Sequence, residues 1–266
     1  MSTFLSQLPM YLLSLPVLLM AFSVHESAHG YAAYRLGDPT ARNLGRITLN
    51  PIKHLDLLGT ICMIIAHVGW AKPVPINTRN FKNPKRDMAI SGAAGPISNL
   101  CLAILHLVLL RVVLLILSPS LQNEAASFAG SLMLGSDFSA SVKFMICSLL
   151  VYILYLGIIM NISLAIFNLI PVPPFDGSRI FYAFLPTKWY FAVMKYERAI
   201  MLAFLLLFAL GALSGPLAVA QNFVSDGLLS LFGMGNSIRY YHEMLEVSDP
   251  GVLLFDLLYF VNHLFA

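Results

Sequence analysis

Charge is scarce in this sequence. Among 266 residues there are only 16 lysines and arginines and 13 aspartates and glutamates, so 11% of the residues are charged while 58% are hydrophobic. Soluble domains usually carry about a quarter charged residues, and a folded chain of this size cannot hide so much apolar surface from water. The composition excludes a soluble globular enzyme and a disordered chain, and it indicates an integral membrane protein.

Cysteine and excess basic charge are lacking as well. The three cysteines, Cys62, Cys101 and Cys147, are too few for a disulfide scaffold. The formal net charge is only +3, whereas nucleic-acid binding requires a strong basic excess. Nucleic acid is therefore excluded as a partner, and the lipid bilayer is the expected surrounding.

Four apolar segments are long enough to cross a membrane. A bilayer core about 30 Å thick requires about 20 apolar residues in a helix. The sequence predicts such helices at about residues 8–36, 88–117 and 142–170, and a further one at about residues 199–223. We therefore expect an all-α polytopic membrane protein, with a core over residues 1–198 and additional helices over residues 199–266.

Two shorter apolar runs are expected not to cross. The run at residues 57–70 would rise only about 21 Å as a helix, which is too short for the bilayer core. The run at residues 251–266 contains Asp256, Asn262 and His263, so we interpret it as an interfacial helix.

Lysine and arginine cluster on one side of this layout. Nine of them lie between Arg35 and Arg86 and four between Arg179 and Arg198, whereas residues 118–141 contain none. If residues 57–70 do not cross, both clusters face the same side of the membrane. The positive-inside rule predicts that this side is the cytoplasm.

The chain between the first two long helices has a different character. Asp38-Pro39 and Asn50-Pro51 indicate turns. The residues Arg46–Leu49 and Val74–Ile76 are predicted to form short strands at the membrane edge, where the prolines around Val74 restrict one strand to a sheet edge. Such an edge would suit capture of an extended peptide by strand addition.

A histidine and glutamate motif lies near the end of the first long helix. The residues from His25 to His29 read His-Glu-Ser-Ala-His. A spacing of four places both imidazoles on one helix face, where they can bind one zinc ion, while Glu26 can reach a water on that metal. A chain of this composition is expected to contain the pattern by chance about 0.01 times. The motif therefore predicts a zinc site inside the membrane, where ionisable groups are functional candidates.

Asp176 is the best candidate for a third ligand. It lies in the proline-rich segment from Asn168 to Gly177, which follows the third long helix on the same basic side as His29. Prolines stop the helix and leave irregular chain that suits a buried cavity. The alternative interpretation of Asp176 is a turn residue before glycine. His54 and Asp56 lie on the same side as rival ligands, although we expect them to support the site or to lie at the surface.

Together these motifs resemble the site-2 protease family of intramembrane zinc metalloproteases. The resemblance extends through Leu36 to Ala41, Gly69 to Pro75 and Gly95 to Asn99, and it covers about residues 23–180. It implies a three-helix catalytic core formed by the first three predicted helices. We expect a compact form of the family, without a PDZ or CBS domain.

The resemblance also implies a role for each motif residue. One Zn²⁺ would be bound by His25, His29 and Asp176. Glu26 would act as the general base, and Asn168 would hold the scissile peptide or its oxyanion. Asn99 would shape the core near the site, although hydrogen bonding between helices is an equal alternative for this residue.

The expected function is zinc-dependent endoproteolysis within or near membrane-spanning segments. The expected substrate is a single-span membrane protein whose helix partly unwinds before cleavage. The alternatives are a membrane protein that binds or transports metal without cleaving anything, and a catalytically silent scaffold. We expect a bacterial plasma membrane location with the site toward the cytoplasm, and the sequence leaves the oligomeric state open.

Overall fold

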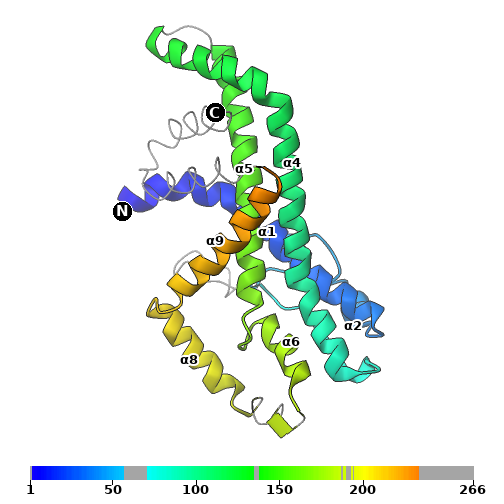
Figure 1. The fold of residues 1–266 in the computed structure, drawn as a ribbon. Coiled ribbons are helices and arrows are strands. Elements are labelled where there is room, and N and C mark those ends of the chain that lie inside the picture. Colours follow the sequence, from blue (N-terminus) through cyan, green and yellow to red (C-terminus); the bar gives the residue numbers. More distant parts are fainter. Residues whose placement is uncertain are drawn as a thin grey trace. The chain divides into compact units, whose positions relative to one another are not determined.

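A computed structural model describes residues 2–56, 71–134, 138–186, 188–189, 193 and 195–233. Three long helices dominate it: α1 (Ser2–Arg35), α4 (Pro84–Leu134) and α5 (Phe138–Asn168) (Figure 1). Segments of all three are long and apolar enough to cross a membrane, at Leu12–Arg35, Pro84–Ile116 and Leu149–Asn168. These segments confirm the first three predicted helices. The predictions for residues 57–70 and 251–266 lie outside the described residues.

Short helices fill the connections. Between α1 and α4 lie α2 (Thr40–Asn43) and two 3₁₀ turns, η1 (Pro51–Lys53) and η2 (Thr78–Asn80). After α5 come α6 (Asp176–Phe184), α8 (Glu197–Ala209) and α9 (Ser214–Leu231). The chain divides into two compact units, of which one comprises Leu18–Leu102 and Met160–Gln221 and holds every candidate site residue.

The second unit comprises Met1–Val17, Ala103–Ile159 and Asn222–Ala266. Its packing includes Leu107, Leu110 and Ile158, which are fully buried. A Cβ on Gly157 would lie 2.3 Å from Cδ2 of His106, so a larger residue there would displace the imidazole that packs against α5.

The predicted helix over residues 199–223 is instead two helices, α8 and α9. The break lies at Gly211, whose φ of +74° favours glycine. The Gly211 amide donates to the Phe208 carbonyl, and the Ala212 amide donates to the Leu207 carbonyl. These two hydrogen bonds end α8. Pro216 then lies in the first turn of α9, where its missing N–H costs no helical hydrogen bond. Neither helix is among the three candidate membrane spans of the described residues.

The two predicted strands are not confirmed, because side chains occupy their backbone groups. Within the described residues, Arg46–Leu49 and Val74–Ile76 form no strand, and the residues Leu55 and Ala71 make only an isolated bridge. Ser27 Oγ donates to the Thr48 carbonyl at 2.6 Å and accepts from the Thr48 amide at 3.1 Å. The Val74 amide donates to Glu26 Oε2 at 2.8 Å. Since Pro73 and Pro75 lack an N–H, Ile76 is the only residue of Val74–Ile76 whose amide is left for a ladder.

Buried Asp38 joins the end of α1 to the segment before α4. Its Oδ1 accepts from the Thr40 amide and hydroxyl and from Asn80 Nδ2, and its Oδ2 accepts from the Asn77 amide. Burial alone would raise the pKa of Asp38, but the hydrogen bonds from Thr40, Asn80 and Asn77 outweigh it and lower the pKa below the ordinary 3.8. This carboxylate therefore fixes the segment that carries Val74 to the site.

We expect the Asp38 anchor to be fully formed above about pH 4 and to weaken as the pH falls through the lowered pKa. Asp38→Asn should destabilise the segment by about 1–3 kcal/mol, because an amide cannot accept all four hydrogen bonds. Hydrogen exchange of the Asn77 amide measures the effect, with exposed Asp226→Asn as the matched control. Equal protection of Asn77 in both variants would contradict this role.

Candidate metal centre

His25 and His29 project from one face of α1 at a spacing of one helical turn. Their rings lie edge to face with centroids 4.6 Å apart, and their Nε2 atoms are 3.0 Å apart. Both residues are buried, at 3% and 5% exposure. The two nitrogens therefore point at a common position.

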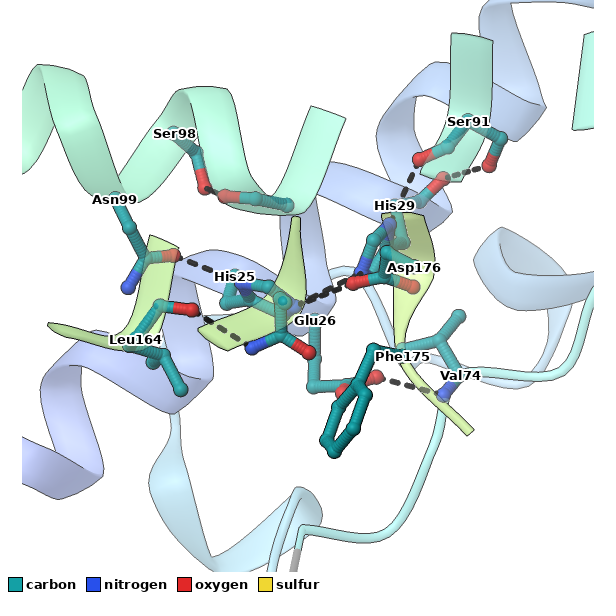
Figure 2. Close-up of polar contacts among 12 residues, drawn as sticks. His25, Glu26, His29, Val74, Ser91, Ser98, Asn99, Leu164, Phe175 and Asp176 are labelled. Atoms are coloured by element: carbon teal, nitrogen blue, oxygen red, sulfur yellow. Dashed lines mark hydrogen bonds and ion pairs between the residues drawn. The ribbon is translucent and has the colours of Figure 1, made fainter. Parts of the chain in front are cut away.

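Asp176 completes this cluster from the first residue of α6. Its Oδ2 lies 3.0 Å from Nε2 of both histidines, so three ligand atoms of three buried residues converge (Figure 2). The turn before α6 is tight, since a Cβ on Gly177 would lie 2.2 Å from the Leu169 carbonyl oxygen. Phe175 packs its ring 4.4 Å from Phe167 and 5.0 Å from Phe204, centroid to centroid. The end of α5 and α8 thereby hold the segment that presents Asp176.

The tautomers of the two histidines are fixed by their other ring nitrogens. Nδ1 of His25 donates to Asn99 Oδ1 at 2.8 Å, and Nδ1 of His29 donates to the Ser91 carbonyl at 2.7 Å. Each neutral imidazole then carries its lone pair on Nε2. The Nε2 lone pair of each histidine therefore faces the Nε2 lone pair of the other histidine and the Asp176 carboxylate. Three acceptors at this distance repel one another unless a cation lies between them.

A zinc ion fits this donor set. With Zn–N distances of about 2.0–2.1 Å, the ligand atoms of a tetrahedral site lie about 3.3 Å apart. The observed separations of 3.0 Å are close to that value. Two imidazoles and one carboxylate leave a fourth position open, which is typical of catalytic zinc sites.

A buried chain of amides supports His25. Asn99 Nδ2 donates to Asn161 Oδ1 at 3.0 Å, which orients the Asn99 oxygen toward the imidazole. Both asparagines are fully buried. The structure thus supports a polar role for Asn99 next to the site. Asn161 was not predicted, although an asparagine in the interior of the apolar helix α5 is a signal of an internal polar contact.

Ser91 and Gly95 shape the face of α4 that meets the histidines. Ser91 Oγ donates to the His29 carbonyl at 3.1 Å, in addition to the bond that its own carbonyl accepts. A Cβ on Gly95 would lie 2.4 Å from His29 Nε2 and 2.6 Å from His25 Cε1. Real Cβ atoms do not approach so closely, so only glycine lets α4 lie against the two rings.

Glu26 lies between the two histidines in the sequence and points toward Val74 (Figure 2). Its Oε2 accepts the Val74 amide at 2.8 Å, and Val74 itself is buried. One carboxylate oxygen is thus held by the backbone, and Oε1 is left to accept a proton from another group.

Asn168 and His54 are not part of the converging set. Asn168 is the last residue of α5, and its Nδ2 donates to the Leu164 carbonyl at 2.9 Å. His54 is buried, and its Nε2 donates to the Thr48 carbonyl at 2.8 Å. Since Thr48 also binds Ser27, His54 supports the loop beside α1 rather than the metal position. Among the described residues, neither His54 nor Asp56 joins the three converging ligand atoms.

Comparison with known proteins identifies the family. The model of peptidase family M50 matches residues 13–211. The chain is 37% identical over 215 residues to "Putative zinc metalloprotease YwhC" of Bacillus subtilis, covering 81% of this chain and 88% of that protein. It is 34% identical over 111 residues to "Putative zinc metalloprotease Rip2" of Mycolicibacterium smegmatis, covering 40% of this chain and 43% of that protein. No solved structure matches it significantly. The chain thus belongs to peptidase family M50, the site-2 protease family, and is a zinc-dependent intramembrane metalloprotease.

Proposed function

We propose that His25, His29 and Asp176 bind the single catalytic zinc ion, and that Glu26 is the general base for hydrolysis of a peptide bond. The observation that carries this proposal is the convergence of two Nε2 atoms and one carboxylate oxygen at 3.0 Å. The hydrogen bonds of Asn99 and Ser91 support it, because they leave both lone pairs facing the metal position.

Zinc, when bound, lowers the pKa of a water ligand and polarises the scissile carbonyl. Oε1 of Glu26 takes the proton of the attacking water while the Val74 amide holds Oε2 in place. Glu26 then delivers that proton to the leaving amine, which restores its carboxylate for the next cycle.

Asn168 is proposed to stabilise the oxyanion. One of its two amide hydrogens is donated to the Leu164 carbonyl, which fixes the side chain at the end of α5. The second hydrogen is then available to a developing negative charge on the substrate. Its position in the segment that leads to Asp176 supports this role.

The proposed substrate is a single-span membrane protein cleaved within or near its helix. A transmembrane helix shields its peptide bonds by internal hydrogen bonds, so it has to unwind locally to reach the zinc position. We place the protein in a bacterial plasma membrane with the basic clusters, and therefore the site, toward the cytoplasm. The lipid bilayer is its surrounding.

The test is metal analysis joined to a cleavage assay. The full chain is purified in detergent without chelator and incubated with a panel of single-span membrane proteins. We expect about one zinc per chain, cleavage that a chelator abolishes, and recovery when zinc is returned. Wild-type protein that cleaves equally well without zinc would overturn the proposal, as would protein purified with no zinc bound.

Asn99→Leu is expected to weaken zinc binding about 10–100-fold, because His25 loses the acceptor that fixes its tautomer. Asn161→Leu should have a smaller effect in the same direction, since it only frees the orientation of Asn99. Zinc affinity measured by competition with a chelating dye checks both. Exposed Asn222→Leu is the matched control, and an Asn99 variant that binds zinc as tightly as this control would contradict the role.

A further inference from the structure

A cavity of about 530 Å³ lies between the beginning of α4 and α6. Its lining comes from Asn83 to Ala93 on one side and from Ile180 to Phe184 on the other. The two helices are close beyond it, since a Cβ on Gly92 would lie 3.3 Å from Cβ of Arg179. No step of the proposed hydrolysis uses this space.

The wall of the cavity is apolar and open to the surroundings. Ile90, Ala93, Ile180 and Phe184 all line it. Ile90 is 46% exposed and Phe184 83% exposed. Ile90 lies near the beginning of the candidate membrane span Pro84–Ile116, where exposed apolar surface suits contact with acyl chains.

Basic side chains gather at the polar end of the same cavity. Lys85 and Arg86 line it, and Lys82 lies just before them. Asp87 is the acidic residue of this turn, and its Oδ1 accepts from Arg86 Nε at 2.8 Å and lies 2.8 Å from Arg86 Nη2. The three basic side chains outnumber the single carboxylate of Asp87, so this end of the cavity carries net positive charge.

Arg86 keeps donors for a ligand despite its pairing with Asp87. A guanidinium carries five N–H groups, and the Arg86 side chain is 62% exposed. Lys85 Nζ donates to the Leu185 carbonyl at the end of α6, so its charge is fixed at the rim. A phosphate there would meet a planar bidentate donor beside a second positive charge.

We propose that this cavity binds an anionic phospholipid. The phosphate lies against Arg86 and Lys85, and an acyl chain runs along Ile90 and Phe184. The charge and the apolar wall meet at the end of a membrane span, the depth at which headgroup phosphates lie. Basic pockets between helices at this depth suit anionic headgroups.

The cavity and the candidate metal centre share the helix α6. α6 begins with Asp176 and lines the cavity with its last turns, so a bound lipid packs against the helix that presents the third proposed ligand. Lipid binding itself requires no zinc. It can therefore be tested separately from the proposed hydrolysis.

The experiment is native mass spectrometry of the full chain in detergent with equal amounts of phosphatidylglycerol and phosphatidylcholine. Wild type should retain phosphatidylglycerol preferentially, and Arg86→Gln should lower that preference about fivefold, the effect of one basic residue at a lipid surface. Arg42→Gln, an exposed arginine outside the cavity, is the matched control and should leave it unchanged. Equal retention of the two lipids by wild type, or equal effects of both variants, would overturn the proposal.

Three further experiments test separate parts of the proposal. Ala93→Leu fills part of the cavity with a larger apolar side chain and leaves the charge unchanged. It should reduce phosphatidylglycerol retention while the zinc content stays at the wild-type level. Glycerol 3-phosphate, which lacks acyl chains, should not displace the lipid at equal concentration, and displacement would overturn the acyl-chain contact. Zinc-stripped protein should still retain phosphatidylglycerol, whatever the outcome of the cleavage assay.

Discussion

Replacing Glu26 by glutamine is expected to reduce peptide cleavage about 10³-fold while zinc stays bound. The amide cannot take a proton from water, and loss of a general base typically costs about 10²–10⁴-fold in rate. The glutamine side chain still offers an oxygen to the Val74 amide, so the segment beside the site should keep its place. The measurement pairs cleavage of a single-span substrate with zinc content per chain.

Glu26→Ala is the matched variant for the hydrogen bond to Val74. It removes the base and also leaves the buried Val74 amide without its acceptor, so it should lose stability in addition to cleavage. A protein that only binds or transports metal would keep its function in Glu26→Gln. Cleavage by Glu26→Gln at the wild-type rate would therefore refute the role proposed for this carboxylate.

The convergence of His25 and His29 could be predicted because it follows from helix geometry, whereas Asp176 was proposed from topology and from the resemblance to the site-2 protease family. The spacing of His25 and His29 on a helix and the basic side shared with Asp176 require no knowledge of packing. The three membrane spans were predictable for a similar reason, since length and apolarity alone decide them.

Several contacts between segments distant in the sequence could not be predicted from the sequence. Arg46–Leu49 and Val74–Ile76 look like strands, yet Ser27 and Glu26 on α1 occupy their backbone groups. The support of His25 by Asn161 through Asn99 depends on how α5 packs near α4. These features require the tertiary structure because each pairs residues that local pattern leaves unrelated.

The break between α8 and α9 was not predicted for a different reason. Gly211 and Pro216 are visible turn signals, but the hydropathy of residues 199–223 is continuous and outweighed them in the prediction. The interruption matters because α8 carries Phe204, which packs on Phe175 next to Asp176. A part of the chain predicted as an addition to the core therefore contributes to the site.

Gly95→Ala is expected to lower zinc affinity and cleavage by about 10²-fold, the upper end of the losses seen when the support of metal ligands is disturbed. The new Cβ would lie 2.4 Å from His29 Nε2 and 2.6 Å from His25 Cε1, so α4 and the rings have to separate. The His29 ring cannot swing away without breaking its bond to Ser91, which lies one turn earlier on the same helix as Gly95. Zinc titration and the cleavage assay measure the effect.

Two other glycines separate this clash from the intrinsic preference of alanine for helices. Alanine is favoured over glycine in a helix by about 0.8–1 kcal/mol, so a substitution without a clash should be neutral or stabilising. A Cβ on Gly227 in α9 would meet nothing within 4 Å, and one on Gly92 would meet Arg179 at 3.3 Å. We expect Gly227→Ala to keep full zinc binding and Gly92→Ala to lose little. If Gly95→Ala bound zinc as tightly as Gly227→Ala, close approach of α4 to the histidines would not be what sets the geometry of the metal centre.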